Sequence, residues 1–204
     1  MRQRIRLAMH DKEHGGMSAQ IEVNETFIGG KARSMQADKR AARIKGTGPA
    51  GRAAVMGLRD RCGPDGHSAV TLKMVPNTRR RHPCPEVRAR VVPGAEVMTD
   101  APPFCAGLGG AYIHRVIDHA EKHVEGTVAT GGLEIFWSPL KRASKGTCIS
   151  VEPFHLFRYP DEEALRFNTC GMEDGQRFPR VLGKLSRRRH TYAQPTGKQQ
   201  GCPA

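Results

Sequence analysis

The chain has 204 residues, which is enough for one domain with a buried core. Lys and Arg outnumber Asp and Glu by 33 to 20, a formal net charge of +13. This excess favours a polyanionic partner, above all nucleic acid, over a merely soluble basic surface. With no run of 18 apolar residues and no apolar stretch near the first residue, we expect neither a membrane span nor a signal peptide. The Cys residues form no C-x-x-C pair, so we expect free thiols in a reducing cytoplasm rather than a zinc ribbon.

The first part of the chain predicts a short helix or linker followed by three strands. Residues 1–18 are polar and basic, whereas residues 20–28 alternate between apolar and polar side chains, as a half-buried strand does. Residues 31–50 are basic with few apolar side chains and predict a loop. Strands over 52–59 and 67–75 are joined by a Gly-Pro-Asp-Gly turn, which indicates a hairpin.

The second part predicts helices alternating with strands. Elements of this order suit an α/β fold in which the first three strands form an antiparallel meander and the later strands add in parallel. Past residue 175 the chain is basic and poor in apolar side chains, so we expect it to fray. The remaining predicted elements are a helix over 86–92, strands over 95–99 and 112–117, and helices over 133–145 and 151–168.

Two acids stand where an active site could use them. Asp100 follows the strand over 95–99, and Glu134 lies at the start of a predicted helix. Lys141 comes two helical turns after Glu134 and so falls on nearly the same face. Such carboxylates, with a third from the first strand, could hold two divalent ions for phosphodiester chemistry, and Mg²⁺ suits oxygen ligands. On spacing alone, a solvated surface carboxylate is the better explanation of each acid taken singly.

Several segments together carry a family resemblance that none carries alone. Over residues 1–195 the chain resembles the ISXO-type bacterial insertion-sequence transposases, which are DDE enzymes related to the eukaryotic Merlin elements. The resemblance implies a ribonuclease-H-like α/β core, a mixed sheet flanked by helices. It also implies cleavage of element-end DNA and strand transfer to target DNA with Mg²⁺ or Mn²⁺. The segments are, in order, IEVNETFIGGKAR, AVMGL, VPNTRRR, VVPGAEVMTDA, YIHRVIDHAEKHVEG, GGLEIFWSPLKR and KGTCISVEPFHLFRYPDEEALRFN.

The resemblance assigns roles to individual positions. The second catalytic Asp of the family falls on Asp100 and the third acid on Glu134, which would be the metal ligands. The DNA-contacting Lys falls on Lys141, and the His of the family's Asp-His-Ala-Glu stretch falls on His119, which a structural role suits about as well. The first catalytic Asp falls on Asn24.

Asn24 breaks the family pattern. A neutral amide offers one acceptor oxygen and no charge, so it cannot bridge two Mg²⁺ ions as a carboxylate does. Glu22 lies on the same face of the strand but is displaced by about 7 Å, and Glu25 points to the opposite face. We therefore expect this copy to be catalytically inactive.

Other departures also suggest a degenerate copy. Gly131 stands where the family has Asn, and Pro139 and Pro160 fall inside predicted helices, where each would cost about 3 kcal/mol. The family's zinc-ribbon end-recognition module is expected to be absent, because the chain starts just before the catalytic domain. The expected organisation is a helix or linker at 1–18, the DDE catalytic domain at 19–175 and a basic, disordered tail at 176–204.

The expected partners are the DNA of the element ends and of the target, with a homo-oligomer if the protein is active, in the bacterial cytoplasm on the nucleoid. Phe136 and Trp137 are better explained as core anchors than as functional groups. The alternatives are a non-catalytic DNA-binding relic, a repressor of active copies, and an unstable product without function. The candidate DNA-contacting residues, for which a solvated loop explains the arginine run about as well, are Arg79, Arg80, Arg81, Lys141 and Arg142.

Overall fold

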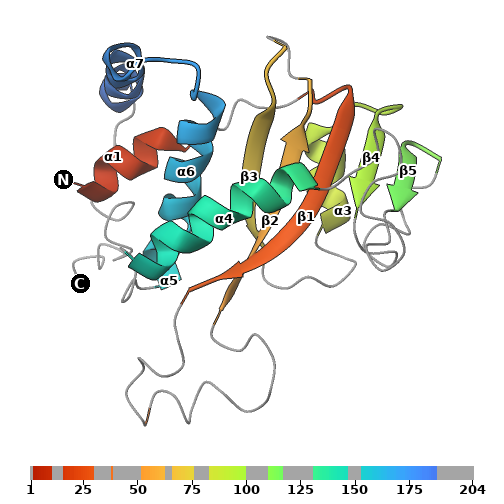
Figure 1. Cartoon of the computed structure of the whole chain (residues 1–204), viewed down its shortest axis with the longest axis horizontal. Helices are drawn as coiled ribbons and strands as arrows, with labels where there is room; N and C mark the ends of the chain where they lie inside the picture. The colour runs from red at the N-terminus through yellow and green to blue at the C-terminus, as the bar shows by residue number, and fades with distance from the viewer. Residues whose placement is uncertain are drawn as a thin grey trace, which may run out of the picture.

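A five-stranded mixed sheet flanked by helices forms the centre of the fold, in the α/β arrangement that the sequence predicts (Figure 1). The computed structural model describes residues 2–10, 16–29, 38, 52–62, 66–75, 83–99, 110–116, 131–146 and 153–187. The strands are β1 (Gln20–Ile28), β2 (Ala53–Asp60), β3 (Ala69–Val75), β4 (Glu96–Thr99) and β5 (Ile113–Val116). The helices are α1 (Arg2–Met9), α3 (Pro83–Arg90), α4 (Gly131–Gly146), α5 (Pro153–Leu156), α6 (Arg158–Asn168) and α7 (Asp174–Arg187).

Strand β1 lies at the centre of the sheet, whose strand order is β3-β2-β1-β4-β5. It pairs antiparallel with β2, which places Asn24 opposite Gly57, and β2 pairs antiparallel with β3. On its other side β1 pairs in parallel with β4, and β4 pairs in parallel with β5. The prediction of an antiparallel meander extended by parallel strands is therefore confirmed.

Two apolar cores cover the two faces of the sheet. One includes Val23 of β1 and packs against Val87 of α3. The other lies under α4, which crosses the sheet in Figure 1. Apolar residues of α4 recur at intervals of three and four, so they form one stripe that faces the strands. The stripe consists of Leu133, Phe136, Trp137 and Leu140, all buried, which confirms the expectation that the two aromatic residues are core anchors.

The two prolines singled out in the sequence have different environments. Pro139 lies inside α4 on its exposed side, and the helix continues to Gly146. Pro160 is the third residue of α6, and the first turn of a helix leaves its N–H groups without intrahelical acceptors. The expectation that Pro160 removes a helical hydrogen bond is therefore wrong, because α6 begins at Arg158 rather than near residue 151.

Pro139→Ala is expected to raise the melting temperature by several degrees. The change restores a backbone donor in the helix interior, which is worth up to about 3 kcal/mol, and each kcal/mol shifts a domain of this size by about 2–4 °C. Pro160→Ala is the matched control, since it restores no helical hydrogen bond and removes buried surface. Thermal unfolding followed by circular dichroism makes the comparison, and equal gains in the two variants would contradict the assignment.

The C-terminal part of the described chain is more ordered than its composition suggests. Where a tail without regular structure was expected from residue 176, α7 runs from Asp174 to Arg187. Arg177 turns back from α7 and donates hydrogen bonds to the backbone carbonyls of Thr169 and Met172, at 2.9 and 3.0 Å. This basic residue thus satisfies carbonyls that follow α6 and joins the two helices, a role that net charge does not reveal.

Helix α1 is likewise part of the packed structure and contacts both α6 and α7. The Arg6 guanidinium pairs with Glu162 at 2.8 Å and lies 4.1 Å from the centre of the Tyr159 ring. Burial would raise the pKa of Glu162, but its hydrogen bonds and charge interactions with Arg6 and Arg166 lower it overall. The N-terminal segment expected as a remnant helix or linker is therefore a helix anchored by ion pairing.

The β3 edge of the sheet is closed by a side chain. Asn168, the last residue of α6, accepts a hydrogen bond from the Val70 N–H at 2.7 Å and donates one to the Val70 carbonyl at 2.9 Å. Its amide thereby occupies the position that a neighbouring strand's peptide group would take.

The described helices include none whose length and apolar content would let it span a membrane.

Candidate active site

Four of the predicted site residues lie in the described structure, Asn24 on β1 and Glu134, Lys141 and Arg142 on α4. Asn24 is nearly buried at the centre of β1, whereas Glu134 and Lys141 are exposed on α4. The other predicted positions lie outside the described residues. Those positions are Asp100, His119, Arg79, Arg80 and Arg81. The last described residue of β4, Thr99, immediately precedes Asp100 in the sequence and is paired with Val23, which immediately precedes Asn24.

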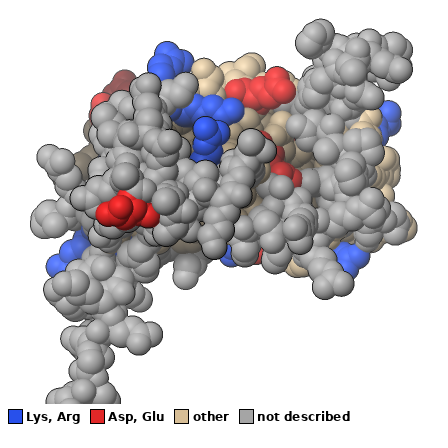
Figure 2. All heavy atoms as spheres, turned by 90° about the horizontal axis from the view of Figure 1, so that it is seen from below, with Lys and Arg blue, Asp and Glu red and all other residues tan. Residues whose placement is uncertain are grey.

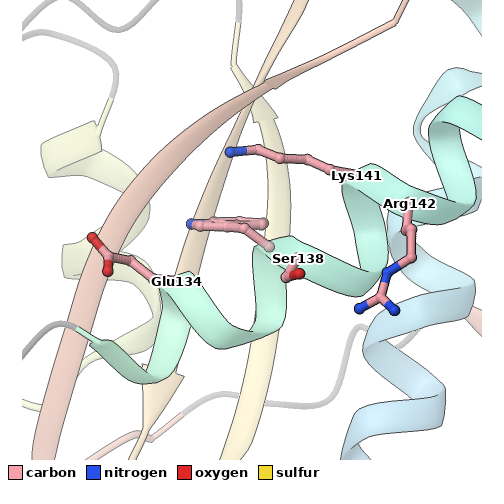
Figure 3. Close-up of a pocket in the computed structure, with 5 residues that line it drawn as sticks. Glu134, Ser138, Lys141 and Arg142 are labelled. Atoms are coloured by element: carbon pink, nitrogen blue, oxygen red, sulfur yellow. The ribbon is translucent and has the colours of Figure 1, made fainter.

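One face of α4 lines a surface cavity of about 480 Å³. The lining residues that the structure describes are Glu134, Trp137, Ser138, Lys141 and Arg142, which follow one another at helical spacing. In Figure 3 the Lys141 amine reaches back along α4 toward the end that carries Glu134, while Arg142 points to the other side. The structure thus brings Glu134 and Lys141 to one cavity, as the spacing of seven predicted.

The close approach of α4 to the sheet depends on Gly57. A Cβ atom at this position would lie 2.8 Å from both Cη2 and Cζ2 of Trp137 and 3.0 Å from Cδ2 of Leu133. The indole therefore lies against bare backbone, directly beside the β1 position occupied by Asn24. This contact sets α4 over the pair of strands in which Asn24 lies opposite Gly57.

Glu22 is already committed to other groups. Its side chain is fully buried, and Oε1 accepts hydrogen bonds from Arg59 Nη1 and Arg61 Nε, both at 2.7 Å. Oε2 accepts a third from the backbone N–H of Leu133 at 3.0 Å. Glu22 could replace a metal-bridging carboxylate at position 24 only if it broke its hydrogen bonds with both arginine side chains and with the first turn of α4.

The described donors do not fit a pair of divalent cations. At the family positions within the described part of the chain, the site has the amide of Asn24 and the carboxylate of Glu134. A pair of hard cations needs several charged oxygens, and one amide oxygen with one carboxylate falls short of this. Across these residues no group of three or more His, Cys, Asp or Glu side chains is arranged to hold a metal ion.

A part-buried polar contact that the sequence did not indicate lies at the end of β4, the strand that pairs with β1. The Thr99 hydroxyl, at the end of β4, and Nε2 of His114, the second residue of β5, are 2.9 Å apart. Burial lowers the pKa of His114, which favours the neutral imidazole at physiological pH.

Comparison with known proteins identifies a family. The family model of the ISXO2-like transposase domain matches residues 16–168, from just before β1 to the last residue of α6. Helices α1 and α7 lie outside the matched range. No curated protein and no solved structure matches the chain.

Proposed function

Because the chain belongs to the ISXO2-like transposase family, we propose that it is an insertion-sequence transposase domain that binds DNA and no longer cleaves it. DDE transposases use divalent metal ions and act on DNA. The ancestral reaction would be cleavage at the element ends followed by attack of the freed 3′-hydroxyl on target DNA. This chain would keep the scaffold and the DNA-facing cations of that reaction.

The observation that carries the proposal is the pairing of an amide at position 24 with a fully occupied Glu22. Asn24 supplies neither the charge nor the second oxygen of the family's first Asp. Glu22 is the nearest acid on the same face of β1, yet Arg59, Arg61 and the Leu133 N–H occupy its oxygens. No described carboxylate on β1 is therefore available to complete the acid set.

The DNA-binding part of the proposal rests on charge. The net charge is +13, and Lys141 and Arg142 are exposed on the cavity that holds Glu134. In Figure 2 a few described Lys and Arg side chains lie together near the top of the view, with acidic side chains close by. Cations beside an acidic site suit a phosphate backbone that must approach a carboxylate.

The chain is expected to bind a labelled DNA duplex with little sequence preference and steep salt dependence. Each neutralised phosphate contributes about 0.9 log units of affinity per tenfold change in salt. Removing two phosphate contacts with Lys141→Ala and Arg142→Ala should lower that slope by up to about 1.8. The control is Arg180→Ala with Lys184→Ala, two cations on α7 away from the cavity.

Fluorescence anisotropy at low and moderate salt measures binding, and the same samples with Mg²⁺ or Mn²⁺ report nicking. We expect binding without nicking. Absence of binding at low salt would refute the DNA-binding part. Nicking that Glu134→Gln abolishes would refute the loss of cleavage.

The runner-up function, a repressor of active copies, follows from the same charge distribution, since a chain that binds without cutting would occupy the DNA that active copies need. Assembly into a homo-oligomer and association with the nucleoid remain predictions.

A further inference from the structure

We propose that Glu22 and Arg59 are positioning residues that fix the first turn of α4 against β1, and so set the placement of the residue at 134 relative to the residue at 24. The inference rests on the proposed function insofar as Glu134 is an active-site position. It assigns to Glu22 a task different from metal binding. Neither residue belongs to the acid triad that the family resemblance implies.

The contact is made at the one part of α4 that offers free donors. Leu133 is the third residue of the helix, and its N–H belongs to the first turn, which has no intrahelical acceptor. The buried Glu22 carboxylate accepts this N–H at 3.0 Å, where the helix dipole also favours a negative charge. Glu134 is the next residue, so its backbone cannot shift along β1 unless this hydrogen bond breaks.

Arg59 holds the carboxylate from the neighbouring strand. It pairs with Glu22 directly across the β1–β2 ladder, and its Nη1 lies 2.7 Å from Oε1. The guanidinium also lies against Gly132, where a Cβ atom would come within 1.8 Å of Nη1 and 2.9 Å of Glu22 Oε2. A side chain at residue 132 would therefore displace the Arg59 guanidinium from its contact with Glu22, which gives a physical reason for the glycine that precedes Leu133 and Glu134.

The rest of α4 is held by different forces. Phe136, Trp137 and Leu140 pack in the apolar core whether or not Glu22 carries a charge. Loss of the carboxylate should therefore loosen the first turn while the apolar stripe stays docked. A merely structural ion pair would instead weaken the whole domain evenly.

Amide hydrogen exchange on the full chain tests this distinction. Glu22→Gln keeps the shape and removes the charge, and Gly132→Ala pushes against the Arg59 guanidinium. Both should speed exchange of the amides of residues 133–137 at least tenfold and leave those of α6 and β2 unchanged. The control is Glu86→Gln on α3, the helix that packs on the opposite face of the sheet. This change removes a carboxylate that pairs with Lys73 of β3 and Arg90 of α3. Uniformly faster exchange, or an unchanged first turn, would overturn the proposal.

A second readout uses the Asn24→Asp chain. There Glu22→Gln should lower the nicking rate constant at least tenfold while the Kd for duplex DNA stays the same. A parallel loss of binding, or an unchanged rate, would count against positioning. If the Asn24→Asp chain does not nick at all, the proposed function fails, whereas the exchange pattern still decides the role of Glu22.

Discussion

Asn24→Asp is expected to raise metal-dependent nicking of element-end DNA by about a thousandfold or more, from a background near that of buffer. An absent acid of this kind costs several kcal/mol of barrier, and about 4 kcal/mol corresponds to a thousandfold in rate. Asp has nearly the volume of Asn, and position 24 is nearly buried opposite Gly57, so the carboxylate fits the existing space. The measurement is single-turnover nicking of a labelled duplex with Mg²⁺, repeated with Mn²⁺.

Two controls make the result decisive. Glu134→Gln should abolish the activity that Asn24→Asp gains, because it neutralises the acid that the structure places on the cavity. Pro139→Ala combined with Asn24→Asp separates an effect on stability from one on chemistry. If the unmodified chain nicks as fast as the Asn24→Asp chain and Glu134→Gln stops nicking in both, Asn24 does not cause a loss of cleavage.

Trp137→Ala is expected to destabilise the domain by about 3–5 kcal/mol, the usual cost of removing a large buried aromatic side chain. Trp137 is 3% exposed, and its ring meets Phe136 edge to face at 5.4 Å between centroids. Its loss also removes the contact with Gly57 that seats α4 on β2. Urea unfolding followed by far-UV circular dichroism measures the change in the free energy of unfolding.

A double variant tests the packing directly. Gly57→Val alone should cost about 1–3 kcal/mol, because its side chain collides with the indole. In the Trp137→Ala background the same valine fills vacated space, so it should restore part of the lost stability. Gly183→Ala, at an α7 glycine with open space around its Cβ position, controls for the general effect of replacing Gly. Additive losses at 57 and 137 would show that the two residues do not touch.

Local patterns allowed most of the fold to be predicted. The alternation over 20–28 located β1, although the strand is not half-buried as expected, since Glu22, Asn24 and Thr26 on its polar face are buried as well. The spacing of Leu133, Phe136 and Leu140 defines α4. The α7 helix was missed because the low apolar content of the segment outweighed its helical periodicity; Val181 is buried, α7 packs on α1, and Arg177 adds hydrogen bonds to carbonyls that follow α6.

The candidate site was predictable only in part. The family resemblance located Asn24 and Glu134, and spacing placed Lys141 beside Glu134. The role of Glu22 could not be predicted, because its partners Arg59 and Leu133 lie 37 and 111 residues away in the chain. Nothing in the segment IEVNET distinguishes an acid that pairs with arginine side chains from one that binds metal ions. The same limit applies to Pro160, whose effect depends on where α6 begins.

The amide of Asn168 has a consequence for self-association. Exposed strand edges recruit further strands from other chains, and this is a common route to aggregates. Because Asn168 already satisfies both backbone groups of Val70, that stretch of β3 offers no docking point to an incoming strand. Within the described part of the chain, the opposite edge is β5, whose Ile113 and Val116 are exposed. At the Val70 end of β3, pairing with a strand of another chain is therefore disfavoured.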